Sequence, residues 1–281
     1  MTESPVFYTP GEDPAMEQVS ARARETFCFF WREMAWEQRR IIPGCDMAAV
    51  KAAFSDPPEI RAQNPGGLEV EQMWVTEVDF DGRIISGTLI NSPDSLQTFS
   101  EGDRVEIPLK RLTDWMYVIA GEVCGGFTID LMRSRMSPQE RKHHDEAWGM
   151  DFGEVGIVNV VPPAFLGQAK KKGFFSGFSK PKAVPQDYAA LAATEHPMSV
   201  NMRESLEQNL KQDPSLLTGA DDKGFTFLHQ LALAGSLDGV DVCLKQGANP
   251  KQPAKNGMTP LALAKSLGWT KVVERLRQAG G

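Results

Sequence analysis

The sequence predicts an α+β fold in which N-terminal helices pack on a small, strongly bent antiparallel β-sheet or partly open barrel, followed by an all-α solenoid. A helical pattern of apolar residues near the N-terminus gives way to short alternating segments. Near the C-terminus, two segments recur at a spacing of 33 residues, which is typical of helical repeats. We therefore divide the 281 residues into a first domain at 1–163, a linker at 164–186 and a repeat domain at 187–281.

The first domain is predicted to begin with two helices. Apolar residues recur every three or four positions from Val19 to Met34, and Pro43-Gly44 is expected to close this helix. A shorter helix is expected from Asp46, as its N-cap, to about Phe54, where an Asp-Pro-Pro sequence stops it.

The rest of the first domain alternates between apolar and polar residues, as half-buried strands do. Asp81-Gly82 is the strongest hairpin signal in the chain, and Gly121-Glu122 is expected to form a second turn. Five short strands after two helices indicate the small bent sheet. The predicted strands cover residues 71–80, 83–90, 104–109, 115–119 and 123–131.

The C-terminal repeats contain the residues that paired helices require. Thr226 and Thr259 can cap a helix, and Gly235 and Gly268 follow where the first helix of each pair must end. This opening, this glycine and a Gly-Ala-Asn close at 247–249 resemble the ankyrin repeat, whose unit is two short helices and a turn. The resemblance implies an interaction surface. Since two repeats cannot bury a core alone, the helices expected before them would complete an array of about three repeats, the first degenerate.

Two positions depart from the repeat pattern. Phe227 stands where the repeat usually has proline, and Ala262 stands where it usually has histidine. His229 is therefore the motif's single histidine, and we expect it to hydrogen-bond the backbone at the turn. The residues predicted to lie at the projecting turns and to contact a partner are Phe225, Phe227, Asn256 and Met258.

Composition indicates an ordinary cytoplasmic protein. Hydrophobic residues make up 41% of the chain and charged residues 24%, and no apolar run reaches the roughly 18 residues that a membrane helix needs. The first 14 residues contain acidic residues and prolines where a signal peptide would be basic and then apolar. Four cysteines without a C-x-x-C pair indicate free thiols in a reducing compartment.

Charge is unevenly distributed along the chain. Residues 1–163 hold 27 acidic and 15 basic side chains, while residues 185–281 hold ten of each. An acidic domain repels phosphate backbones, so we expect no direct nucleic-acid binding and instead a basic protein partner. The acidic residues proposed to contact that partner, on or beside the first hairpin strand, are Glu69, Glu71, Glu77 and Asp79.

The linker combines lysines with phenylalanines and glycines. Residues 164–184 contain five lysines and no acidic residue. This composition would suit contact with anionic lipid or RNA. The composition favours a flexible hinge instead, so no membrane partner is predicted.

Several motifs in the first domain resemble the YegJ-like family, a bacterial domain of unknown function, over roughly residues 25–160. The resemblance implies a domain identity and a bacterial origin but no activity. The motifs are Met73-Trp74-Val75, Gly87-Thr88-Leu89-Ile90-Asn91, Gly102-Asp103, Asp114-Trp115-Met116-Tyr117, Gly125-Gly126-Phe127-Thr128 and Trp148-Gly149-Met150-Asp151-Phe152-Gly153.

The most reactive-looking cluster is His143-His144-Asp145-Glu146, on a helix that begins with the capping box Ser137-Pro138-Gln139-Glu140. Adjacent histidines on a helix point about 100° apart, so they cannot share one metal ion. A solvated polar helix face is the favoured interpretation. No nucleophile elbow, phosphate-binding loop or dinucleotide motif is present, so we predict no catalytic residue, no metal and no cofactor.

An acidic domain without a catalytic motif, joined to ankyrin-like repeats, is typical of a protein that binds another protein. The pairing resembles bacterial immunity proteins, such as the TsiT-type partners of type VI secretion toxins. The resemblance implies neutralisation of a toxin, for example a nuclease, by occlusion. One alternative is a small hydrolase or metal-dependent enzyme with a site between the domains that uses His143, His144 and Asp145 or Glu146. The other is an ankyrin scaffold or regulator unrelated to toxins.

Overall fold

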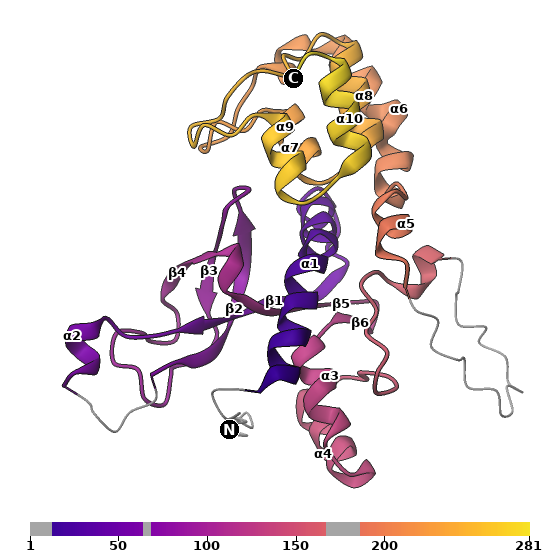
Figure 1. The fold of residues 1–281 in the computed structure, drawn as a ribbon. Helices are drawn as coiled ribbons and strands as arrows, with labels where there is room; N and C mark the ends of the chain where they lie inside the picture. The colour runs from indigo at the N-terminus through magenta and orange to yellow at the C-terminus, as the bar shows by residue number, and fades with distance from the viewer. Residues whose placement is uncertain (1–12, 64–68, 167–185) are drawn as a thin grey trace, which may run out of the picture. The chain divides into compact units, whose positions relative to one another are not determined.

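A computed structural model describes residues 13–63, 69–166 and 186–281 of the chain (Figure 1). Two compact units are present. The N-terminal unit comprises Met1–Thr26, Pro43–Asp79 and Ile84–Pro185, and the C-terminal unit comprises Phe27–Ile42, Phe80–Arg83 and Gln186–Gly281. Most of the expected linker, residues 167–185, lies outside the described residues.

Long helix α1 (Pro14–Glu37) confirms the predicted first helix and contributes residues to both units. It ends ahead of the expected Pro43-Gly44. Six strands form one antiparallel sheet in the order β4-β3-β2-β1-β5-β6, so the sheet is open, with β4 and β6 at its edges. The strands are β1 (Cys45–Phe54), β2 (Glu71–Phe80), β3 (Ile84–Leu89), β4 (Arg104–Pro108), β5 (Leu112–Ile119) and β6 (Glu122–Gly125).

The helix predicted from Asp46 to Phe54 is wrong, because these residues form β1. Its alanines favour a helix in isolation. In the sheet, however, Val50 lies opposite Val75 of β2 on one side and Trp115 of β5 on the other. Two partner strands and a buried position outweigh the small helix propensity of the segment.

The predicted last strand, residues 123–131, is also corrected. Strand β6 ends at Gly125, and α3 (Phe127–Ser134) follows. Gly125 and Gly126 both have φ of 80°, a conformation that favours glycine, and this pair turns the chain from strand to helix. The other helices of the N-terminal unit are α2 (Pro58–Arg61) and α4 (Pro138–Trp148), with 3-10 turns η1 (Leu109–Arg111) and η2 (Pro163–Leu166).

The C-terminal unit contains the predicted helix pairs, and Figure 1 shows them beside one another. Thr226 and Thr259 are N-caps, as expected. Gly235 lies in the turn between the two helices of the first pair and packs against the ring of Trp269. A Cβ added to Gly235 would come 2.4 Å from the indole. The helices are α5 (Tyr188–Ala192), α6 (Pro197–Gln212), α7 (Phe227–Leu233), α8 (Leu237–Lys245), α9 (Pro260–Ser266) and α10 (Thr270–Gln278), with η3 (Pro214–Leu217) after α6.

Candidate functional site

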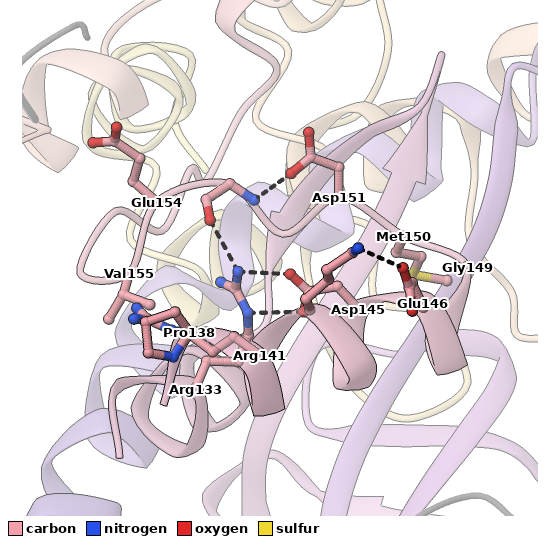
Figure 2. Close-up of a pocket in the computed structure, with 12 residues that line it drawn as sticks. Arg133, Pro138, Arg141, Asp145, Glu146, Gly149, Met150, Asp151, Glu154 and Val155 are labelled. Carbon is pink, nitrogen blue, oxygen red and sulfur yellow. Dashed lines mark hydrogen bonds and ion pairs between the residues drawn. The ribbon is translucent and has the colours of Figure 1, made fainter. Parts of the chain in front are cut away.

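An open depression of about 820 Å³ lies along α4 and the loop after it, and it contains the acidic half of the His-His-Asp-Glu cluster (Figure 2). Arg133 forms its centre. The guanidinium donates to both carboxylate oxygens of Asp145, at 2.9 and 2.8 Å, and to the carbonyl of Gly153 at 3.0 Å. Its plane also lies over the Phe152 ring, 5.5 Å from the centroid. These contacts join α3, α4 and the loop 149–156.

The two histidines of the cluster have different surroundings. His143 is exposed, and its nearest carboxylate is Glu146 at 3.8 Å. His144 is buried against Trp148 and Phe152, and its Nδ1 lies 2.9 Å from an Asp145 oxygen. The interpretation of a solvated polar face therefore holds for His143 and is wrong for His144. The capping box at Ser137 is confirmed, with both reciprocal hydrogen bonds present.

Asp114 is a buried carboxylate that sequence reasoning missed. It accepts hydrogen bonds from the N–H groups of Trp115, Phe127 and Thr128 at 2.8 to 2.9 Å, and from the Thr128 hydroxyl at 2.6 Å. Burial raises the pKa of Asp114, while these donors and nearby Lys51 act in the opposite direction. The carboxylate caps the N-terminus of α3 from a neighbouring strand. The sequence signal that could have revealed this role is an isolated aspartate inside an otherwise apolar strand.

Lys51 lies beside Asp114 on the same face of the sheet. Strand register places it between Trp74 and Asp114, and its Nζ is 5.6 Å from the Trp74 ring centroid. Burial lowers the pKa of Lys51, and Asp114 counteracts that shift. Trp74 in turn meets Trp148 edge to face at 6.3 Å. The contacts from Lys51 through Trp74 to Trp148 support the packing of α4. None of these three side chains lines the depression.

The residues predicted to touch a partner on the repeats are engaged within the C-terminal unit. Phe225 is buried and stacks on His229 with 5.8 Å between ring centroids, and Met258 is also buried. Phe227 is half-buried, with the Arg39 guanidinium 5.8 Å from its ring centroid. The Asn256 amide donates to the backbone carbonyl of Asp81 at 3.1 Å. Contact between these side chains and another protein stays a prediction.

His229 has the role expected of it. Its Nδ1 accepts the Thr226 N–H at 3.2 Å, and its Nε2 lies 2.9 Å from the carbonyl oxygen of Gln252. The ring therefore bridges the first repeat to the turn that precedes the second, with the proton on Nε2. Burial lowers the pKa of His229, which keeps this neutral form favoured.

The second half of α1 is held by the helices of the C-terminal unit. Glu33 is buried and lies 3.0 Å from Nε2 of His196, whose Nδ1 accepts the Met198 N–H at the start of α6. Trp36 stacks on the same imidazole at 5.7 Å. Arg32 donates to the carbonyl of Thr194 at 3.1 Å. This part of α1 belongs to the core of the unit.

The acidic residues predicted to steer a partner are placed in several different ways. Glu69 and Glu77 are exposed, and Asp79 is half-buried. Glu71 already accepts the backbone N–H groups of Asp94, Ser95 and Leu96 and so fixes a loop.

Neither a metal site nor a membrane span is found in the part of the chain that the structure describes. No group of three or more His, Cys, Asp or Glu side chains there is arranged to hold a metal ion. No helix among the described residues combines the length and the apolar character needed to cross a bilayer.

Comparison with known proteins identifies relatives of both regions. Residues 13–152 match the family "Uncharacterized protein conserved in bacteria (DUF2314)". The chain is 28% identical to the uncharacterized protein YegJ of Escherichia coli over 85 residues, which are 30% of this chain and 49% of YegJ, and this supports the expected YegJ-like resemblance. It is 36% identical to the putative ankyrin repeat protein NMB1133/NMB1171 of Neisseria meningitidis serogroup B, over 98% of both chains. The chain therefore belongs to the family of this Neisseria protein, and its first half matches the DUF2314 family of uncharacterised bacterial proteins.

Proposed function

We propose that the chain is a protein-binding module and that its C-terminal helix pairs are ankyrin repeats. The observation that carries the proposal is the end-to-end similarity to a protein named as an ankyrin repeat protein. Three features of the chain itself support it: the 33-residue spacing, the threonine caps of α7 and α9, and the bridging role of His229. Stacked helix pairs of this kind offer an extended surface to a protein partner.

We further propose that the chain acts by binding and not by catalysis. Both oxygens of Asp145 are engaged by Arg133, and one of them also lies beside His144. A general base must lie within hydrogen-bond reach of the proton that it abstracts, and both Asp145 oxygens already face the Arg133 guanidinium. Exposed His143 lies 3.8 Å from the carboxylate of Glu146, which is itself exposed. These contacts favour a structural cluster over the hydrolase or metal-enzyme alternatives.

The specific role that we propose is that of a cytoplasmic immunity protein, which neutralises a basic toxin or effector, for example a nuclease, by occlusion. The excess of 12 acidic side chains over residues 1–163 supports it, because such a surface would steer a basic partner into contact. The bacterial distribution of the matching family agrees with this role. A scaffold or regulator with a non-toxic partner is the competing proposal.

Co-expression with the product of the adjacent gene tests the role. If that product arrests growth, we expect this chain to restore growth and to copurify with it as a stoichiometric complex. The His143→Ala variant should protect as well as the natural chain does. Protection without any complex would overturn the binding proposal in favour of an enzyme, and a stable complex with a harmless neighbour would favour the scaffold.

A further inference from the structure

The turn between β2 and β3 lies against the second helix pair of the C-terminal unit. Phe80–Arg83 belong to this unit. A Cβ added to Gly82 would come 2.4 Å from Cδ2 of Leu263, 3.1 Å from Cε of Met258 and 3.7 Å from Oγ of Ser266. Only a glycine therefore fits here without displacement of its neighbours. The turn is thus seated closely on an apolar floor.

A polar contact fixes the orientation of the same turn. The Asn256 amide nitrogen donates to the backbone carbonyl of Asp81 at 3.1 Å and lies 3.3 Å from its carboxylate. The Asn256 oxygen accepts the Met258 N–H at 3.0 Å, which fixes the direction of the amide. Within the turn, the Asp81 carboxylate accepts the Arg83 N–H at 2.8 Å. The Asn256 amide thus faces the acidic residue of the turn, and the apolar side chains of Met258 and Leu263 face its glycine.

We propose that Asn256, Met258, Leu263 and Ser266 form a recognition site for β-turns of the Asp-Gly type, here called the turn site, and that the chain's own Asp81-Gly82 turn occupies it. The inference rests on the proposed function and states the partner's chemistry: a protein that presents a tight turn with an acidic residue followed by glycine. Such a turn would compete with the internal one. Because a tethered ligand acts at an effective concentration of about millimolar, the internal turn masks the site from weak external ligands.

The test uses the full-length chain and a cyclised peptide that contains residues 78–84 as the probe. Gly82→Val should expel the internal turn, because valine disfavours the φ of 95° and its Cβ would clash with Leu263. Gly102→Val is the matched control, since Gly102 has a φ of 87° and no atom within 4 Å of an added Cβ. We expect Gly82→Val to bind the peptide at least tenfold more tightly than the natural chain or Gly102→Val, and the added change Asn256→Ala to abolish the gain.

Equal binding by Gly82→Val and the natural chain, or no binding by either, would overturn the proposal. If Gly82→Val does not fold, Asn256→Ala replaces it, because it removes the donor of the turn site and keeps the Asp81–Arg83 hydrogen bond within the turn, with hydrogen exchange of the 80–83 amides as the readout. Faster exchange there than in Gly102→Val is expected, and unchanged exchange overturns the proposal. The peptide assay requires no toxin, so a failure to copurify with the neighbouring gene product would refute the proposed function alone.

Discussion

Each compact unit contains an ionisable side chain with no exposed surface, Asp114 in the N-terminal unit and His229 in the C-terminal unit. Both accept backbone N–H groups at the start of a helix, α3 for Asp114 and α7 for His229. Asp114 acts as a carboxylate across 13 or 14 residues of sequence. His229 acts as a neutral ring three residues from its donor, in a capping box. The same role, acceptance of N–H groups at the start of a helix, is thus filled by a residue distant in sequence in the N-terminal unit and by a neighbouring residue in the C-terminal unit.

This difference predicts different responses to mutation and to pH. Removal of Asp114 leaves several buried donors without an acceptor, whereas protonation of His229 removes its single acceptor nitrogen. The loss of unfolding free energy should therefore differ between the two units in its size and in its dependence on pH.

The largest effect is expected for Asp114→Ala. It should lower the free energy of unfolding by about 3 to 5 kcal/mol, because the N–H groups of Trp115, Phe127 and Thr128 lose their acceptor inside the protein. Urea denaturation followed by circular dichroism measures this. Exposed Asp151, which accepts a single N–H from Gly153, supplies the control, and Asp151→Ala should cost less than about 1 kcal/mol. Similar losses for both variants would contradict the capping role of Asp114.

The next effect is expected for His229→Leu, which should lower the free energy of unfolding by about 2 kcal/mol near neutral pH, because leucine can neither accept the Thr226 N–H nor donate to the Gln252 carbonyl. The natural chain should also be less stable in acid. Since the pKa of His229 is lowered by burial, the unfolded chain takes up the proton first, so this contribution is complete above about pH 6.5 and is lost as pH falls through the lower folded pKa.

Thermal denaturation of the natural chain and of His229→Leu between pH 7.5 and 5 checks the direction of this pH dependence. The stability difference between them should shrink as pH falls. His143→Ala, a change at an exposed histidine, should retain the natural pH profile. A constant difference across the range would remove His229 from the acid response.

A smaller loss of about 1 to 2 kcal/mol is expected for Phe227→Ala. The ring is half-buried beneath the Arg39 guanidinium, so the change removes apolar contact and a cation–π interaction. Leu216→Ala, at an exposed apolar residue of the same unit, should stay within about 0.5 kcal/mol. An unchanged melting temperature with weaker binding to a partner would instead identify Phe227 as a contact residue.

The smallest effect is expected for His143→Ala, with stability changed by less than about 0.5 kcal/mol. His144→Ala is its matched comparison and should cost more, because it removes a buried ring that packs against both Trp148 and Phe152. Thermal denaturation of the two variants gives the comparison. Equal losses would mean that the helix face of α4 is solvated at both positions.

The sequence by itself determined the features whose partners lie a few residues apart. The Asp81-Gly82 hairpin, the capping box at Ser137, the threonine caps of the repeats and the bridging histidine were all predictable. Each depends on residue types that favour one backbone conformation or one neighbouring donor. The acidic balance of the first domain was likewise available from composition alone.

Only the tertiary structure decided which segments pair and which side chains become buried. Strand β1 takes its conformation from β2 and β5, whose paired residues lie 17 to 25 and 60 to 74 positions away in the sequence, against the helix propensity of its alanines. Asp114 caps a helix 13 residues further along the chain, and Met258 contacts the turn at Gly82, 176 residues before it. Local propensities differ by less than about 1 kcal/mol per residue, so the burial and hydrogen bonding supplied by distant segments decide the outcome.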